Sequence, residues 1–102
     1  MAAYIIITKF RTRNPSQLEA YASKRESFLA GHPIRWLAYF SGRFEVVEGP
    51  GAESVAILEF PTLAEAKAWY TSPVYQEACQ HRFRGGDYGV MLVEGAAAPP
   101  TK

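Results

Sequence analysis

Three segments of this 102-residue chain, at positions 4–10, 54–60 and 88–94, carry apolar side chains at most consecutive positions and not only at every second one. The segments are rich in β-branched and aromatic residues, which favour β-strands. Because successive side chains of a strand point to opposite faces, a sheet built from these segments is apolar on both faces. Any fold that the chain adopts must therefore cover both faces of its sheet.

Two helical regions separate the strands, and capping residues mark where they start. Asn14 is predicted to cap the first helix, which begins at Pro15 and ends at Gly31. The second helix begins after Thr62 and is interrupted at Ser72, which is predicted to cap the helical segment that follows.

One more extended run, residues 34–41, continues through residues 44–47 after a bend at Gly42. The predicted order is therefore β-α-β-β-α-β. This order is typical of an α+β domain in which two helices cover one face of a four-stranded antiparallel sheet. We predict a single domain over residues 1–95, followed by a flexible tail at 96–102.

Two helices cover only one face of such a sheet, and the other face is apolar as well. In the segment 54–60, for example, Val55 and Ile57 point to the face opposite to that of Ala56 and Leu58. An exposed apolar patch beyond roughly 600 Å² is unusual for a monomer. We therefore predict a two-fold homodimer in which the open sheet faces of two copies pack together. The alternative is a loop or tail of the same chain that folds over this face.

Charge, cysteine content and the N-terminal segment narrow the possible partners and the expected compartment. Eleven Lys and Arg against ten Asp and Glu leave the chain nearly neutral, without the clustered basic surface that binds nucleic acids or anionic membranes. Cys79 is the only cysteine, so no intrachain disulfide is possible. The N-terminal segment has neither the charged start of a signal peptide nor the length of a membrane span. We expect a cytoplasmic protein.

Motifs for metals and cofactors are not found in the sequence. The two histidines, His32 and His81, stand far apart, and no Gly-rich phosphate loop follows the first strand. We therefore predict neither a metal site nor a cofactor.

The second half of the chain carries an unusual run of residues. It reads Ala68-Trp69-Tyr70-x-Ser72-Pro73-x-Tyr75-Gln76-x-Ala78, after Leu58-Glu59-Phe60-Pro61-Thr62 and before Arg82. With this run the chain resembles the domain-of-unknown-function 1330 family over residues 3 to 95. The resemblance implies a ferredoxin-like fold within the dimeric α+β barrel superfamily, which includes cofactor-free monooxygenases, polyketide cyclases and chlorite-dismutase-like haem enzymes. The family has no established general activity, so the resemblance implies the fold and the dimer but no reaction.

The chain departs from this family around three arginine positions and keeps the arginine only at the first of them, Arg35. Pro33-Ile34-Arg35 stands where relatives usually have Gly-Gly-Arg, residues 39–41 replace a second arginine, and Ser54 replaces a third. If these arginines hold an anionic ligand in relatives, this chain has lost much of that capacity. We therefore do not carry an anionic substrate over to it.

Two residues are candidates for proton transfer. An imidazole changes its charge near physiological pH, so His32, at a predicted helix–strand junction, is a candidate general base. Glu59 shares a strand face with two aliphatic residues, where an unpaired carboxylate is costly. It is therefore the second catalytic candidate; alternatively, it forms a structural ion pair with Arg35 or Arg82.

The candidates for ligand binding are aromatic or cationic: Arg35, Tyr39, Trp69, Tyr70, Tyr75 and Arg82. The rings cluster around the interrupted helix, and Arg35 or Tyr39 would hold an oxyanion. We predict a semi-enclosed cleft between helices and sheet, with Glu59 in its wall and His32 or Arg35 near its mouth.

The leading hypothesis is a homodimer that binds a small organic molecule in this cleft, with cofactor-free monooxygenase-, isomerase- or cyclase-like activity as its enzymatic form. The alternative is a non-catalytic dimerisation or sensing module. Polar groups that converge on an open cavity favour the first hypothesis, and a filled core favours the second.

Overall fold

The computed structural model describes residues 1–96, so the tail predicted at 96–102 lies outside the described residues except for Ala96. Within residues 1–96, four strands form one sheet in the order β2-β3-β1-β4, and each neighbouring pair is antiparallel. The strands are β1 (Ala3–Thr12), β2 (Arg35–Ala38), β3 (Ser54–Phe60) and β4 (Gly86–Glu94). This order places two strongly apolar strands, β1 and β3, at the centre of the sheet.

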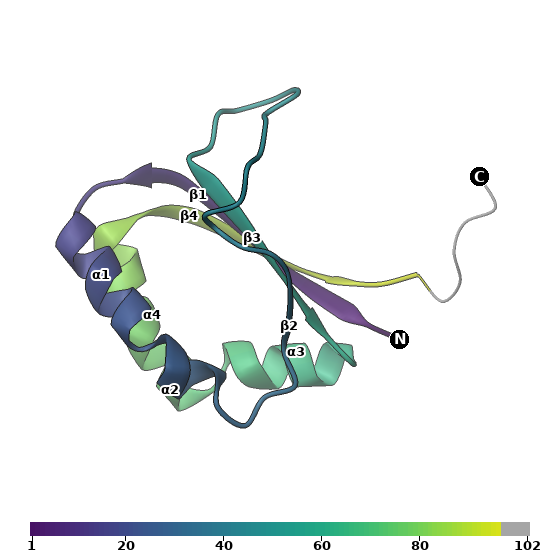
Figure 1. The fold of residues 1–102 in the computed structure, drawn as a ribbon. Helices are drawn as coiled ribbons and strands as arrows, with labels where there is room; N and C mark the ends of the chain where they lie inside the picture. The colour runs from purple at the N-terminus through teal and green to yellow at the C-terminus, as the bar shows by residue number, and fades with distance from the viewer. Residues whose placement is uncertain (97–102) are drawn as a thin grey trace.

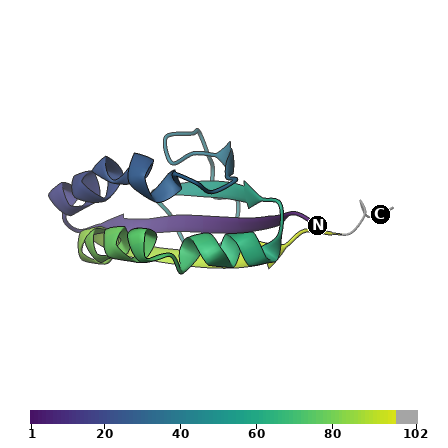
Figure 2. The same cartoon turned by 90° about the horizontal axis from the view of Figure 1, so that it is seen from below.

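The helices of the described part of the chain lie on one face of this sheet, as Figures 1 and 2 show. They are α1 (Pro15–Ser23), α2 (Arg25–Leu29), α3 (Leu63–Tyr70) and α4 (Pro73–Gly85). The predicted α+β fold, with helices on one face of a four-stranded antiparallel sheet, is confirmed. Over residues 1–96, no helix combines the length and the apolar character that a membrane crossing needs.

Side chains cap α1, α3 and α4 where the sequence predicts them. The hydroxyls of Thr62 and Ser72 accept hydrogen bonds from the backbone N–H three residues later, at 3.1 and 3.3 Å. The Asn14 side chain accepts one from the N–H of Ser16, at 3.2 Å. Each bond satisfies a donor that the start of a helix leaves without a partner. The interruption of the second helical region at Ser72 is therefore confirmed.

Two predicted boundaries are wrong. The first helical region is divided at Lys24 into α1 and α2. The second strand ends at Ala38, and residues 44–47 form no strand. A turn, closed by a hydrogen bond from the Gly42 N–H to the Tyr39 carbonyl oxygen at 2.9 Å, follows β2 and leads the chain out of the sheet as a long loop (Figure 1). The loop segment has strand-forming side chains, but a strand also needs a neighbouring backbone to pair with.

Apolar side chains occupy both faces of the sheet. The helix-facing side chains of the central strands are almost completely buried: Ala3, Ile5, Ile7, Ala56, Leu58 and Phe60. The opposite face, called here the outer face, carries apolar side chains that remain partly exposed: Tyr4, Ile6, Val55, Ile57, Met91 and Val93. In the part of the chain that the structure describes, no helix covers the outer face (Figure 1). The prediction of a sheet with two apolar faces is confirmed.

An aromatic cluster fills the space between the helices and one end of the sheet. The rings of Trp69 and Tyr75 stack with their centroids 4.0 Å apart, and the ring of Phe28 meets Tyr75 edge-on at 5.0 Å. The Trp69 indole N–H donates a hydrogen bond to the Phe28 carbonyl oxygen at 2.8 Å. Aromatic pairs of this kind contribute roughly 0.5–1.5 kcal/mol beyond the burial of their area. The cluster ties α2, α3 and α4 together.

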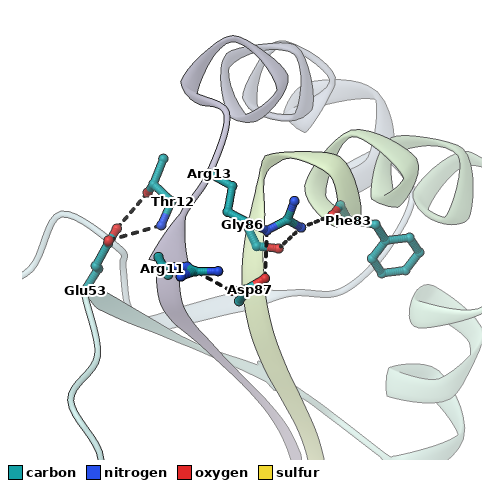
Figure 3. Close-up of polar contacts among 7 residues, drawn as sticks. All are labelled: Arg11, Thr12, Arg13, Glu53, Phe83, Gly86 and Asp87. Atoms are coloured by element: carbon teal, nitrogen blue, oxygen red, sulfur yellow. Dashed lines mark hydrogen bonds and ion pairs between the residues drawn. The ribbon is translucent and has the colours of Figure 1, made fainter.

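Polar contacts join the end of α4 to the end of β1 (Figure 3). The Arg13 guanidinium donates hydrogen bonds to the carbonyl oxygens of Phe83 and Gly86, at 2.6 and 3.2 Å, and to the Asp87 carboxylate at 2.8 Å. Arg11 donates to the other Asp87 oxygen at 3.1 Å. The hydrogen bond from Arg13 lowers the pKa of Asp87 below its ordinary value. These contacts satisfy carbonyl groups at the C-terminal end of α4 and hold that helix in place over the sheet.

Candidate ligand-binding cleft

A cleft of about 140 Å³, called here the main cleft, lies between the helices α1 and α2 and the sheet. Its walls are mainly aromatic: Tyr21, Phe28, Trp36, Phe40, Trp69 and Tyr88. Aliphatic side chains complete the apolar surface: Ile7, Leu18, Ala22 and Leu58. An apolar cavity of about 150 Å³ is large enough for benzene. A cleft between helices and sheet is therefore present, at the size of a single aromatic ring, but the residues predicted to form it, Glu59 with His32 or Arg35, do not line it.

Two cationic side chains line the main cleft, and within residues 1–96 no acidic one does. The Lys9 amine lies 3.6 Å from the Glu53 carboxylate. That carboxylate also accepts hydrogen bonds from the hydroxyl and the backbone N–H of Thr12, and the bond from the hydroxyl is the main cause of its lowered pKa. The Arg25 guanidinium lies 5.0 Å from the ring centroid of Tyr39. Arg25 takes no part in the ion pairs of the described residues.

Two tyrosine hydroxyls meet at the aromatic wall of the main cleft. The hydroxyl oxygens of Tyr21 and Tyr75 lie 2.8 Å apart. Tyr21 lines the main cleft, whereas Tyr75 is completely buried. Burial raises the pKa of Tyr21 to about 12 and raises that of Tyr75 as well. Both hydroxyls are therefore neutral at physiological pH, and neither supplies a negative charge.

Arg82, on α4, is only 2% exposed. Its guanidinium lies 5.0 Å from the ring centroids of both Phe83 and Tyr88. One N–H group, at Nη2, donates to the Cys79 sulfur at 3.7 Å, and Nε has no hydrogen-bond partner among the described residues. Since Tyr88 also lines the main cleft, this ring contacts both the guanidinium and the cleft.

The predicted position of Glu59 in the wall of this cleft is wrong. Glu59 does share a face with Val55 and Ile57, but that face is the outer one. Its carboxylate lies 3.4 Å from Nε of Arg35, which stands opposite it on β2. The set of β3 side chains that faces the helices contains no carboxylate, so burying that set avoids desolvating a charge. The alternative prediction, a buried ion pair of Glu59 with Arg35 or Arg82, is confirmed for the partner Arg35 and is wrong on burial, because the Arg35 side chain is 76% exposed.

The remaining predicted residues lie around the main cleft or apart from it. Glu59 and Arg35 line a separate depression of about 340 Å³ at the edge of the sheet. His32 lies in the loop between α2 and β2 and lines neither this depression nor the main cleft. Tyr70 lines another depression, of about 180 Å³, against β4. Tyr39 stacks edge-on against Trp36 at 4.8 Å, beside the main cleft.

The main cleft depends on residues that the sequence analysis did not single out, above all Lys9, Arg25, Tyr21, Trp36 and Tyr88. The sequence could have predicted the position of Lys9 alone. It lies two residues after Ile7 and four after Ile5 on the same strand, so its side chain points to the same face of the sheet as these buried residues. Tyr21 falls on the apolar face of its helix, which predicts burial but no contact with a ligand. Trp36 and Tyr88 stand on β2 and β4, at opposite edges of the sheet, and only the tertiary structure brings both to the same cleft.

The sequence profile of the Domain of unknown function (DUF1330) matches residues 2–96. The chain belongs to this family. The match confirms the resemblance that the run around Trp69 and Tyr75 indicates. Among curated proteins, none matches this DUF1330 chain.

Solved structures similar to this DUF1330 protein share its fold at low sequence identity. RPA0582, a protein of unknown function from Rhodopseudomonas palustris, was solved in a methylated form. It is 20% identical in sequence with a TM-score of 0.71, and the match covers 99% of this chain and 84% of that one. A dimeric ferredoxin-like protein of unknown function from Thermobifida fusca is 13% identical with a TM-score of 0.61, over 90% and 89%. SnoaB, a cofactor-independent oxygenase from Streptomyces nogalater, is 11% identical with a TM-score of 0.61, over 97% of both chains. These likenesses confirm the ferredoxin-like α+β fold.

Proposed function

We propose that this protein binds a small, largely apolar organic molecule in the main cleft. The observation that carries the proposal is an open cavity with aromatic walls, at which the cations Lys9 and Arg25 converge. A module that served dimerisation alone would have no need to leave this space between helices and sheet unfilled. Trp69 forms part of the wall, and Tyr39 holds Arg25 at its side.

The proposal is binding and not a particular reaction. Glu59 and His32, the two candidates for proton transfer, do not line the main cleft. The oxygenase activity of SnoaB belongs to a protein that shares the fold at 11% identity, and a shared fold does not carry a reaction with it. Cofactor-free catalysis in the main cleft would have to rely on its tyrosines and its two cations.

The proposed binding is testable through the two tryptophans of the chain, because both line the main cleft. In an NMR titration with a set of neutral and anionic one-ring aromatic compounds, we expect saturable shifts of both indole N–H signals. Ala22→Phe should fill the cleft and abolish these shifts, whereas Ala68→Phe, at an exposed position of α3, should leave them intact. The proposal fails if no compound shifts the signals, or if Ala22→Phe binds as well as the wild type.

We also propose that two copies pair through their outer faces. The support is the row of exposed apolar side chains that no described helix covers, together with the dimeric state named for the Thermobifida fusca protein. Light scattering at micromolar concentration should give about twice the chain mass of 11.3 kDa. Met91→Lys, at a position 62% exposed in the single chain, should give monomers; Val74→Lys, on the helix side, should not. A wild-type monomer, or a dimeric Met91→Lys protein, would contradict the pairing.

A further inference from the structure

The guanidinium of Arg82 is a buried positive charge without a negative partner. The ion pairs of the described residues join Lys9 to Glu53, Arg11 and Arg13 to Asp87, and Arg35 to Glu59, and Arg82 is in none of them. Burial of an unpaired charge is costly, and a guanidinium does not lose its proton in proteins. The fold therefore carries a charge that it does not neutralise.

The described side chains that contact the Arg82 guanidinium are the rings of Phe83 and Tyr88 and the sulfur of Cys79, with no carboxylate among them. The contact with the sulfur of Cys79 is weak, and Nε has no partner within the described part of the chain. The face of the Tyr88 ring offers a cation–π contact, which compensates only part of the lost hydration.

The position of this charge links it to the main cleft. Tyr88, whose ring lies against the Arg82 guanidinium, also lines the cleft. Between the Arg82 guanidinium and the cleft lies the Tyr88 ring and not solvent, and a charge acts more strongly through such a low-dielectric path than it would across water. Lys9 and Arg25 lie on the lining itself, and no described acidic residue lines the cleft. Because Lys9 is already paired with Glu53, Arg25 is the lining cation that has no acidic partner among the described residues.

We propose that the ligand of the main cleft is an aromatic anion, a single ring that carries a carboxylate or an enolate oxygen, and that Arg82 is the buried positive charge that selects it. The inference rests on the proposed function and specifies the class of ligand. It also differs from the expectation that the sequence supported, because Lys9, Arg25 and Arg82 stand outside the arginine positions at which the chain departs from the family. Aromatic walls hold the ring, and the cations neutralise the anionic group.

Benzoate and benzamide test this inference, because they match in size and differ in charge. We expect the wild type to bind benzoate about tenfold more tightly than benzamide in the NMR titration. Arg82→Met should remove most of this preference and leave benzamide binding unchanged. Its ligand-free form should melt at the same temperature as the wild type or higher, since replacing a buried unpaired charge by an apolar side chain is neutral or stabilising. Arg84→Met, at an exposed position of the same helix, should behave like the wild type.

The outcomes separate this inference from the proposed function. Equal affinity for the two compounds, or an unchanged preference in Arg82→Met, overturns the anionic ligand while the cleft remains a binding site. The anionic ligand is also overturned if the wild type binds neither benzoate nor benzamide. The wider set of one-ring compounds then decides independently whether the cleft binds any ligand. If Arg82→Met does not fold, the wild-type comparison still decides, together with Arg25→Gln, which should weaken benzoate binding and not benzamide binding.

Discussion

The buried hydroxyl pair of Tyr21 and Tyr75 makes a sharp prediction, because the two residues differ in their access to water. The hydroxyl oxygens are 2.8 Å apart, Tyr75 is completely buried, and Tyr21 borders the main cleft. Replacing either tyrosine by phenylalanine keeps the ring and removes one hydroxyl. The cost then depends on what becomes of the hydroxyl that remains.

The two single variants should therefore destabilise the protein unequally. In Tyr75→Phe, the remaining hydroxyl of Tyr21 can reach water in the cleft, so we expect a loss of about 1 kcal/mol in the free energy of unfolding. In Tyr21→Phe, the hydroxyl of Tyr75 is left buried without a partner, and the expected loss is about 2–3 kcal/mol. The double variant leaves no unpaired hydroxyl, so its loss should be about 1 kcal/mol, well below the sum of the two.

Urea unfolding of the four proteins measures these differences, at one fixed protein concentration because a dimer's stability depends on it. For a chain of this size, 1 kcal/mol corresponds to roughly 4–8 °C in Tm, so thermal unfolding is a second readout. Equal losses in the two single variants would refute the assigned difference in water access. Losses that simply add in the double variant would refute the hydrogen bond itself.

Three further predictions concern the frame around the cleft. Ser72→Ala should cost about 1 kcal/mol in urea unfolding, because it removes the cap of α4, and Ser72→Thr should restore most of it. Asp87→Asn should lower the free energy of unfolding at neutral pH but not in strong acid. Folding lowers the pKa of Asp87, so the stabilisation by its carboxylate is present above the ordinary value of 3.8 and is lost as the pH falls below it. A difference in stability from the wild type that persists at about pH 2 would contradict this. Gly85→Ala should cost about 1–3 kcal/mol, because the added methyl group would collide with the Leu18 side chain, whereas Gly51→Ala meets open space and should be neutral.

The elements around the cleft show which features local sequence signals could predict. Thr62 and Ser72 start helices because a hydroxyl there reaches a backbone N–H three residues on, and this geometry needs nothing beyond the local chain. The β3 segment was predicted with its observed bounds, Ser54–Phe60, because its composition and its flanking turns agree. Residues 44–47 have the same kind of composition and form no strand, since strand formation also depends on a distant partner.

The sequence by itself determined the α+β order, the helix starts and the presence of two apolar sheet faces, because each follows from residue type and spacing along the chain. Only the tertiary structure decided which apolar face the helices cover. Alternation divides the side chains of β3 into two sets but does not say which set faces the helices. The set with Glu59 lies on the outer face, because burying a carboxylate costs more free energy than burying aliphatic groups alone. The candidate site was decided at the same level: Lys9, Arg25 and Arg82 come from three different elements, and only packing brings their charges around one cavity.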